Sequence, residues 1–151
     1  MKRPRAGSEK RSELASRYEE YFISSFVKKS RRKRLSFELQ TPGKRYEGIS
    51  RFCHQSEEFL DPAFIRMQGV DLLNQPGFEE FRRGREDLCL LLTPAFWQDE
   101  IFLPFEEALE MAANELDAVV LIAASFAMVF SEVGREGREK YLLQRDGQSD
   151  M

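Results

Sequence analysis

Hydrophobic residues near the start of the chain recur at helical spacing. The apolar positions of this first segment are Leu14, Tyr18, Tyr21, Phe22 and Phe26. They fall on one face of an α-helix, and the residues between them are mostly polar. Ser8 precedes the segment and belongs to a residue type that caps helix starts. We therefore predict an amphipathic N-terminal helix that begins after Ser8 and ends near Lys29.

The hydrophobic pattern changes several times between residues 35 and 82. Residues 35–40 alternate between apolar and polar side chains, which favours a short strand over a continuation of the first helix. Pro42 is a good first helical residue, so we predict a second helix that runs as far as residue 60. Residues 63–77 fit either a short strand or a turn of helix, and a small helix is predicted across residues 78–82.

The second half of the chain carries clearer signals. The run DLCLLL at 87–92 is apolar and bounded by charge and proline, as in a central strand. Residues 105–116 predict an amphipathic helix. The segment AVVLIAA at 118–124 favours a buried strand, with one long buried helix as the alternative. Two strand-like runs around the loop GREG at 134–137 predict a C-terminal β-hairpin.

These elements predict a single α+β domain. Because the last pair of strands is antiparallel while residues 87–124 read as strand, helix and strand, we expect a mixed, mainly antiparallel sheet. We expect the helices to pack largely on one face of it. Residues 1–7 are predicted to be a disordered basic arm, residues 8–146 the globular domain, and residues 147–151 a disordered tail.

Charge is divided unevenly along the chain. Residues 1–53 hold 15 lysines and arginines against six glutamates, a net charge of +9, whereas residues 54–151 have a net charge of −12. Such an asymmetry bears on association with charged partners rather than on the fold. The simpler alternative is that the two halves neutralise each other once the chain folds.

The sequence also bears on where the protein is found. The basic start MKRPR is followed by polar residues rather than by the apolar run of a secretion signal. The longest apolar run, 118–130, has 13 residues where about 20 are needed to cross a bilayer. Cys53 and Cys89 are then expected to remain thiols in a reducing compartment. We expect a cytoplasmic protein that does not bind membranes.

The single histidine offers the only candidate metal site. If one helix continues through this region, His54 shares its face with carboxylates three, four and seven residues further on. The weak candidate ligands are His54, Glu57, Glu58 and Asp61. The simpler interpretation is a partly exposed histidine whose charged form Glu58 favours. Cys53 is adjacent to His54, and adjacent helical side chains point about 100° apart, so no cysteine–histidine dyad is expected. We found no catalytic constellation and expect no cofactor.

The most basic segment, VKKSRRKR, places six cations in the seven positions from Lys28 to Arg34. Around a helix they would point in all directions, so the segment must remain in water. Cations near the C-terminal end of the first helix would interact favourably with its dipole, which is the simplest explanation of the basic run. With further cations on the next helix, the segment also fits a phosphate-contacting patch. The candidate nucleic-acid contacts are Lys28, Lys29, Arg31, Arg32, Lys33, Arg34, Lys44, Arg45 and Arg51.

The other unusual segment is TPAFWQDEIFLPF at 93–105, which follows a predicted strand. Loops of this kind gather where partners bind, and an aromatic side chain with acidic neighbours is typical of an anchor for a basic partner. The alternative is that the aromatic side chains fold inward and close the core. The candidate partner contacts are Phe96, Trp97, Asp99, Glu100 and Phe102.

Two functional hypotheses follow from these segments, and a third, an enzyme or metal protein built around His54, follows from the histidine region. The first is a non-catalytic protein that binds another macromolecule, expected to be a protein, through the 93–105 loop and the acidic C-terminal half; the acidic side chains suit a basic partner. The second is a nucleic-acid-binding module that uses the basic segment 28–51.

Overall fold

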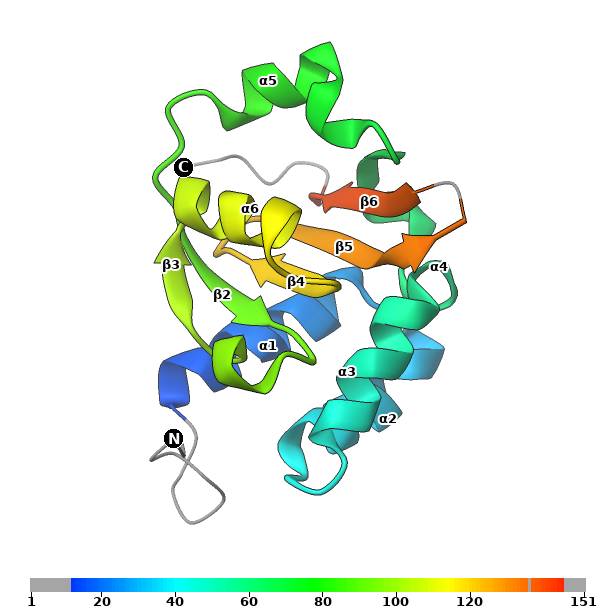
Figure 1. Ribbon diagram of the computed structural model, residues 1–151. Helices are drawn as coiled ribbons and strands as arrows, with labels where there is room; N and C mark the ends of the chain where they lie inside the picture. The colour runs from blue at the N-terminus through cyan, green and yellow to red at the C-terminus, as the bar shows by residue number, and fades with distance from the viewer. Residues whose placement is uncertain (1–11, 136, 146–151) are drawn as a thin grey trace.

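A computed structural model describes residues 12–135 and 137–145 of the chain (Figure 1). Its α-helices are α1 (Glu13–Phe26), α2 (Lys29–Gln40), α3 (Arg45–His54), α4 (Ser56–Phe59), α5 (Pro76–Arg82) and α6 (Phe105–Asn114). Its strands are β1 (Ile65–Gly69), β2 (Leu88–Leu92), β3 (Phe102–Pro104), β4 (Val119–Ile122), β5 (Ala127–Gly134) and β6 (Gly137–Leu143). Short 3-10 helices are η1 (Pro62–Phe64), η2 (Leu72–Asn74) and η3 (Phe96–Gln98). The predicted arm 1–7 and tail 147–151 lie outside the described residues.

The six strands form one sheet in the order β1-β6-β5-β4-β2-β3. Every neighbouring pair is antiparallel, and the predicted single-domain α+β class is confirmed. The parallel pair expected within residues 87–124 does not form, because the short strand β3 turns the chain back before α6. The helix then returns the chain to β4, which runs opposite to β2.

Helices cover both faces of the sheet, and the larger group lies on one of them (Figure 1). The helices α1 to α4 pack against the face that carries Leu90 and Val120. The helices α5 and α6 cover the face that carries Leu91 and Leu121. Alternate residues of each central strand therefore serve two different cores, which explains why these strands are apolar throughout.

The first helix has the amphipathic character predicted for it. Phe22 and Phe26 are fully buried. The helix begins at Glu13 because the side chain of Ser12 accepts a hydrogen bond from the backbone N–H of Ala15 (3.2 Å). The predicted cap, Ser8, lies outside the described residues. Neither α1 nor any other helix in the described ranges has the length and apolar composition needed to cross a bilayer.

The remaining predictions for the second half are confirmed. The helices α5 and α6, the strands β2 and β4, and the C-terminal hairpin of β5 and β6 all form where the pattern placed them. Residues 118–124 therefore contain a buried strand rather than part of a long helix. Residues 63–77, which fitted either type of structure, contain both β1 and the short turn η2.

The strand predicted at residues 35–40 is wrong, because these residues form the second half of α2. Leu35 and Leu39 are four residues apart, so a helix buries both on one face, next to α1 and α3. Phe37, which an alternating strand would have placed beside them, is exposed instead. The helix predicted up to residue 60 is divided into α3 and α4 by a break at Gln55.

Candidate functional site

A buried ion cluster joins three segments that are distant in sequence. Arg45 at the start of α3 donates hydrogen bonds to Glu19 of α1 (2.7 Å, Nη2 to Oε2) and to Asp99 (2.7 Å, Nε to Oδ2). Glu100 Oε2 lies 3.5 Å from Arg45 Nε. The carbonyl of Leu39 accepts a further hydrogen bond from Arg45 Nη1 (2.9 Å). All four charged side chains are buried.

The cluster fixes the turn that follows β2. Burial would lower the pKa of the Arg45 guanidinium, but the hydrogen bond to Asp99 and the charge of Glu19 outweigh this effect and raise the pKa above its ordinary value. Asp99 also accepts a hydrogen bond from the backbone N–H of Thr93 (3.2 Å), at the other end of the same turn. Glu100 completes the turn with a left-handed backbone (φ 69°). Residues 93–100 are therefore held against α1 and α3.

An open groove of about 610 Å³ is built from residues next to this cluster. Its lining residues are Tyr46, Ser50, Thr93, Pro94, Ala95, Trp97, Glu115, Leu116, Asp117, Ala118, Glu132 and Val133. Tyr46, Trp97 and Val133 are 63%, 66% and 65% exposed, and no other large hydrophobic side chain in the described residues is as exposed. The apolar side chains that the fold leaves most open to water thus line one groove.

Acidic side chains complete the groove. Glu115 and Asp117 come from the segment after α6, and Glu132 comes from β5; all three are exposed. None of the lining residues is basic. On the side of α3, His54 Nδ1 lies 2.9 Å from Glu132 Oε1. The groove therefore combines exposed apolar side chains with negative charge.

Two walls of the groove are positioned by the ion cluster. Tyr46 directly follows Arg45 on α3, and Trp97 stands two residues before Asp99. Because Arg45 binds Asp99 directly, the segments that carry the two aromatic side chains are held at a fixed separation. The buried charges thus determine the shape of an exposed apolar surface.

The structure separates the residues predicted for the 93–105 loop. Trp97 is exposed and lines the groove, but the side chains of Asp99 and Glu100 turn inward to Arg45. The predicted outward acidic rim is therefore wrong for these two residues, because a buried arginine requires their charges. Phe102 is half-buried and packs edge-to-face on Tyr18, with ring centroids 5.2 Å apart. Phe96 belongs to η3.

The structure also divides the nine predicted nucleic-acid contacts. Arg45 is buried in the ion cluster, so its assignment to an exposed patch is wrong. Arg31 pairs with Glu58 (3.6 Å), and Arg32 donates to the carbonyl of Val27 (2.8 Å). The remaining arginines, Arg34 and Arg51, both pair with Glu38 (3.1 and 2.7 Å). Four lysines have no described ion pair, namely Lys28, Lys29, Lys33 and Lys44.

The candidate metal ligands do not come together. The helix break at Gln55 separates His54 from the carboxylates that follow it. Glu58 pairs with Arg31, and Asp61 accepts a hydrogen bond from the backbone N–H of Ala63 (3.0 Å). Within residues 12–135 and 137–145, no three side chains of the metal-binding types are grouped around one point. Glu57 is exposed on α4.

Both cysteines belong to the core. Cys53 lies in the core on the α1 side of the sheet, and Cys89 lies on the opposite side. Burial raises the pKa of each thiol to about 12, with a smaller contribution from Glu132 at Cys53 and from Asp87 at Cys89. At neutral pH neither thiol supplies the thiolate that nucleophilic chemistry requires.

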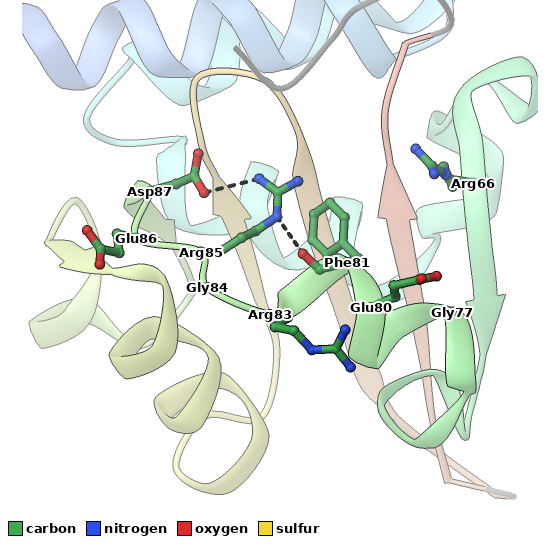
Figure 2. Close-up of a pocket in the computed structure, with 9 residues that line it drawn as sticks. All are labelled: Arg66, Gly77, Glu80, Phe81, Arg83, Gly84, Arg85, Glu86 and Asp87. Carbon is green, nitrogen blue, oxygen red and sulfur yellow. Dashed lines mark hydrogen bonds and ion pairs between the residues drawn. The ribbon is translucent and has the colours of Figure 1, made fainter.

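Another open cavity, of about 770 Å³, lies between α5 and the start of β2. Figure 2 shows Arg85 directed between Asp87 and the carbonyl of Phe81, whereas Arg66 and Arg83 stand apart from it. Arg85 donates to that carbonyl (2.8 Å) and to Asp87 (3.1 Å), and its guanidinium lies 3.8 Å from the centre of the Phe81 ring. These contacts attach the end of α5 to the sheet, so we assign Arg85 a structural role.

Of the residues that line the groove, only Trp97 was among the candidate partner contacts predicted from the sequence. Glu115, Asp117, Glu132 and Val133 come from two segments that no motif marks, and only the folded chain brings them to Trp97.

Comparisons with protein-family models, with curated proteins and with solved structures found no match to this chain.

Proposed function

We propose that the protein is a binding protein whose groove holds a basic segment of a partner protein. The observation that carries this proposal is the convergence of Tyr46, Trp97 and Val133 with three acidic side chains in one groove. Large apolar side chains gathered on a surface mark interaction sites more often than single exposed ones do.

The apolar walls suit an anchor side chain. Tryptophan and tyrosine are enriched among the residues that contribute most to binding, because each buries a large area with few rotatable bonds. The ion cluster holds the segments of Tyr46 and Trp97 in place before any partner binds. A groove formed in advance saves the ordering cost of binding.

The acidic walls select the charge of the partner. Glu115, Asp117 and Glu132 repel an acidic segment and attract a basic one, mainly by raising the association rate. The partner segment that fits therefore combines lysine or arginine with at least one bulky apolar side chain.

A random library of 12-residue peptides, selected on immobilised protein, tests this proposal. We expect enriched peptides with net positive charge and a large apolar side chain. Trp97→Ala should weaken binding of these peptides by about 2 kcal/mol, because it removes a central aromatic wall. Its free energy of unfolding should stay within about 0.5 kcal/mol of wild type, because the side chain is two-thirds exposed.

Leu88→Ala is the matched control, since Leu88 is also an exposed large hydrophobic residue and lies outside the groove. It should bind the selected peptides as tightly as wild type does. Failure to enrich any peptide, enrichment of acidic peptides, or equal binding by Trp97→Ala would each contradict the proposal.

A further inference from the structure

The second helix has the wrong charges for a stable start. Five of its first six residues are cationic, the N-cap residue is Lys28, and no side chain caps the free N–H groups. The N-terminus of a helix carries positive partial charge, so cations there are unfavourable. The neighbouring helix α1 has the favourable arrangement, with the Ser12 cap and Glu13 in its first turn. The dipole explanation of the basic run is thus incomplete: Arg32 donates to the Val27 carbonyl at the end of α1, whereas the run as a whole begins α2.

Packing explains only part of this basic segment. Leu35 and Leu39 bury one face of α2, and Arg32 satisfies the carbonyl that ends α1. Lys29, Lys33 and Phe37 are spaced by four residues and lie along the opposite face, which we name the outer face of α2. Both lysines are exposed and have no carboxylate partner among the described residues, and Phe37 is 57% exposed.

The outer face combines three features that a polyanion recognises. Its lysines reinforce the positive potential of the helix start, and no acidic residue stands in the first turn. Phe37 adds an aromatic ring in line with the two charges. Proteins that bind single-stranded nucleic acid use this combination, with cations on the phosphates and an aromatic side chain stacked on an unpaired base.

Other polyanions fit the outer face less well. Helices that bind an anionic membrane surface have a broad apolar face. Phe37 is the single large apolar side chain on the outer face of α2. Duplex DNA offers no unpaired base on which Phe37 can stack.

We infer that the outer face of α2 binds single-stranded nucleic acid, with Lys29 and Lys33 on phosphates and Phe37 stacked on a base. This inference is independent of the groove, because none of the three residues lines it.

Fluorescence anisotropy with fluorescein-labelled oligo(dT) and oligo(U) of 20 nucleotides tests the inference. We expect binding at 50 mM salt that weakens steeply by 200 mM. Lys29→Gln with Lys33→Gln should weaken binding at 50 mM by about tenfold or more and reduce the slope of log K against log salt by about 1.4, since each phosphate contact on a single strand contributes about 0.7. Phe37→Ala should weaken binding by about five- to tenfold and leave the slope unchanged.

Matched controls separate this surface from general charge and from the groove. Arg83→Gln with Arg135→Gln removes two exposed cations that do not belong to α2 and should bind as wild type does. Trp97→Ala should also bind as wild type does. The inference is overturned if neither oligonucleotide binds at 50 mM salt, or if the double lysine variant binds like its control. Binding to phosphatidylserine vesicles, with none to oligonucleotides, would overturn it in favour of a lipid surface.

Discussion

Arg45 and the lysines of α2 are close in sequence, but their environments in the fold are opposite. Arg45 is buried and is surrounded by three carboxylates and a carbonyl oxygen. Lys29 and Lys33 are exposed at the start of a helix whose dipole opposes them. The same kind of side chain thus supports the fold in one region and works against it in the other.

The difference separates structural charge from charge that is free to act on another molecule. A buried arginine with matched carboxylates is explained within the chain. Local conflict between a residue and its own helix is instead typical of positions retained for function. Measurements of stability can therefore distinguish the cations that support the fold from those that do not, without knowledge of any partner.

The largest effect is expected for Arg45→Met. The substitution keeps much of the volume but leaves Glu19, Asp99 and Glu100 buried without their cation. Breaking a buried ion pair from one side costs about 3–5 kcal/mol, and urea denaturation measures the loss.

Lys33→Met is the matched control for Arg45→Met and should change stability by less than about 0.5 kcal/mol, because Lys33 is exposed. If the two variants were equally stable, the ion cluster would have no structural role and the comparison would fail.

A smaller effect is expected where α2 meets α3. A side-chain carbon added at Gly48 would lie 2.8 Å from Cβ of Glu38, which is too close, so the two helices must move apart. Gly48→Ala should lower stability by about 1–2 kcal/mol, because overpacking outweighs the better helix propensity of alanine. Differential scanning calorimetry measures the loss.

Gly43→Ala provides the reference for this experiment. A side-chain carbon at Gly43 meets nothing within 4 Å, and stability should stay the same or rise slightly. If Gly48→Ala were as stable as wild type, α2 would be attached only loosely to α3. The unfavourable charges at the start of α2 would then cost little, and they would need no functional explanation.

The smallest effect has the opposite sign. Lys29→Glu places an acidic residue in the first turn of α2 and should raise the free energy of unfolding by about 0.3–1 kcal/mol. Lys33→Glu, one turn further along, should gain less. Both gains should shrink in 0.5 M salt, because the charges are exposed and screened. A loss of stability in Lys29→Glu would show that the lysine supports the fold after all.

Much of the fold followed from the hydrophobic pattern. The helix α6 and the hairpin could be predicted because their patterns are clear, and the central strands because their apolar runs are bounded by charge and proline or are rich in β-branched residues. Residues 35–40 failed because six residues fit both periods, and only the partners of Leu35 and Leu39 decide between them. The three-residue strand β3 is too short to give a pattern, and with it the direction of β4 could not be predicted.

The candidate site followed from the sequence only in part. The sequence marked Trp97 as unusual but gave no direction for its side chain. It could not reveal that Asp99 forms an ion pair with Arg45, since the two are 54 residues apart and no local pattern connects them. Charge counted along the chain combines buried pairs with exposed side chains, and only the folded structure separates the two.

The edges of the sheet have a consequence for how the protein meets other chains. The edge strand β3 has three residues and ends at Pro104, which has no N–H to donate. The other edge, β1, has an irregular register between Ile65 and Met67 and ends at Gly69 with a φ of 144°. Neither edge offers a long, regular row of free backbone groups onto which a foreign strand could add. We therefore expect concentrated solutions of the folded protein to resist edge-to-edge growth into fibrils.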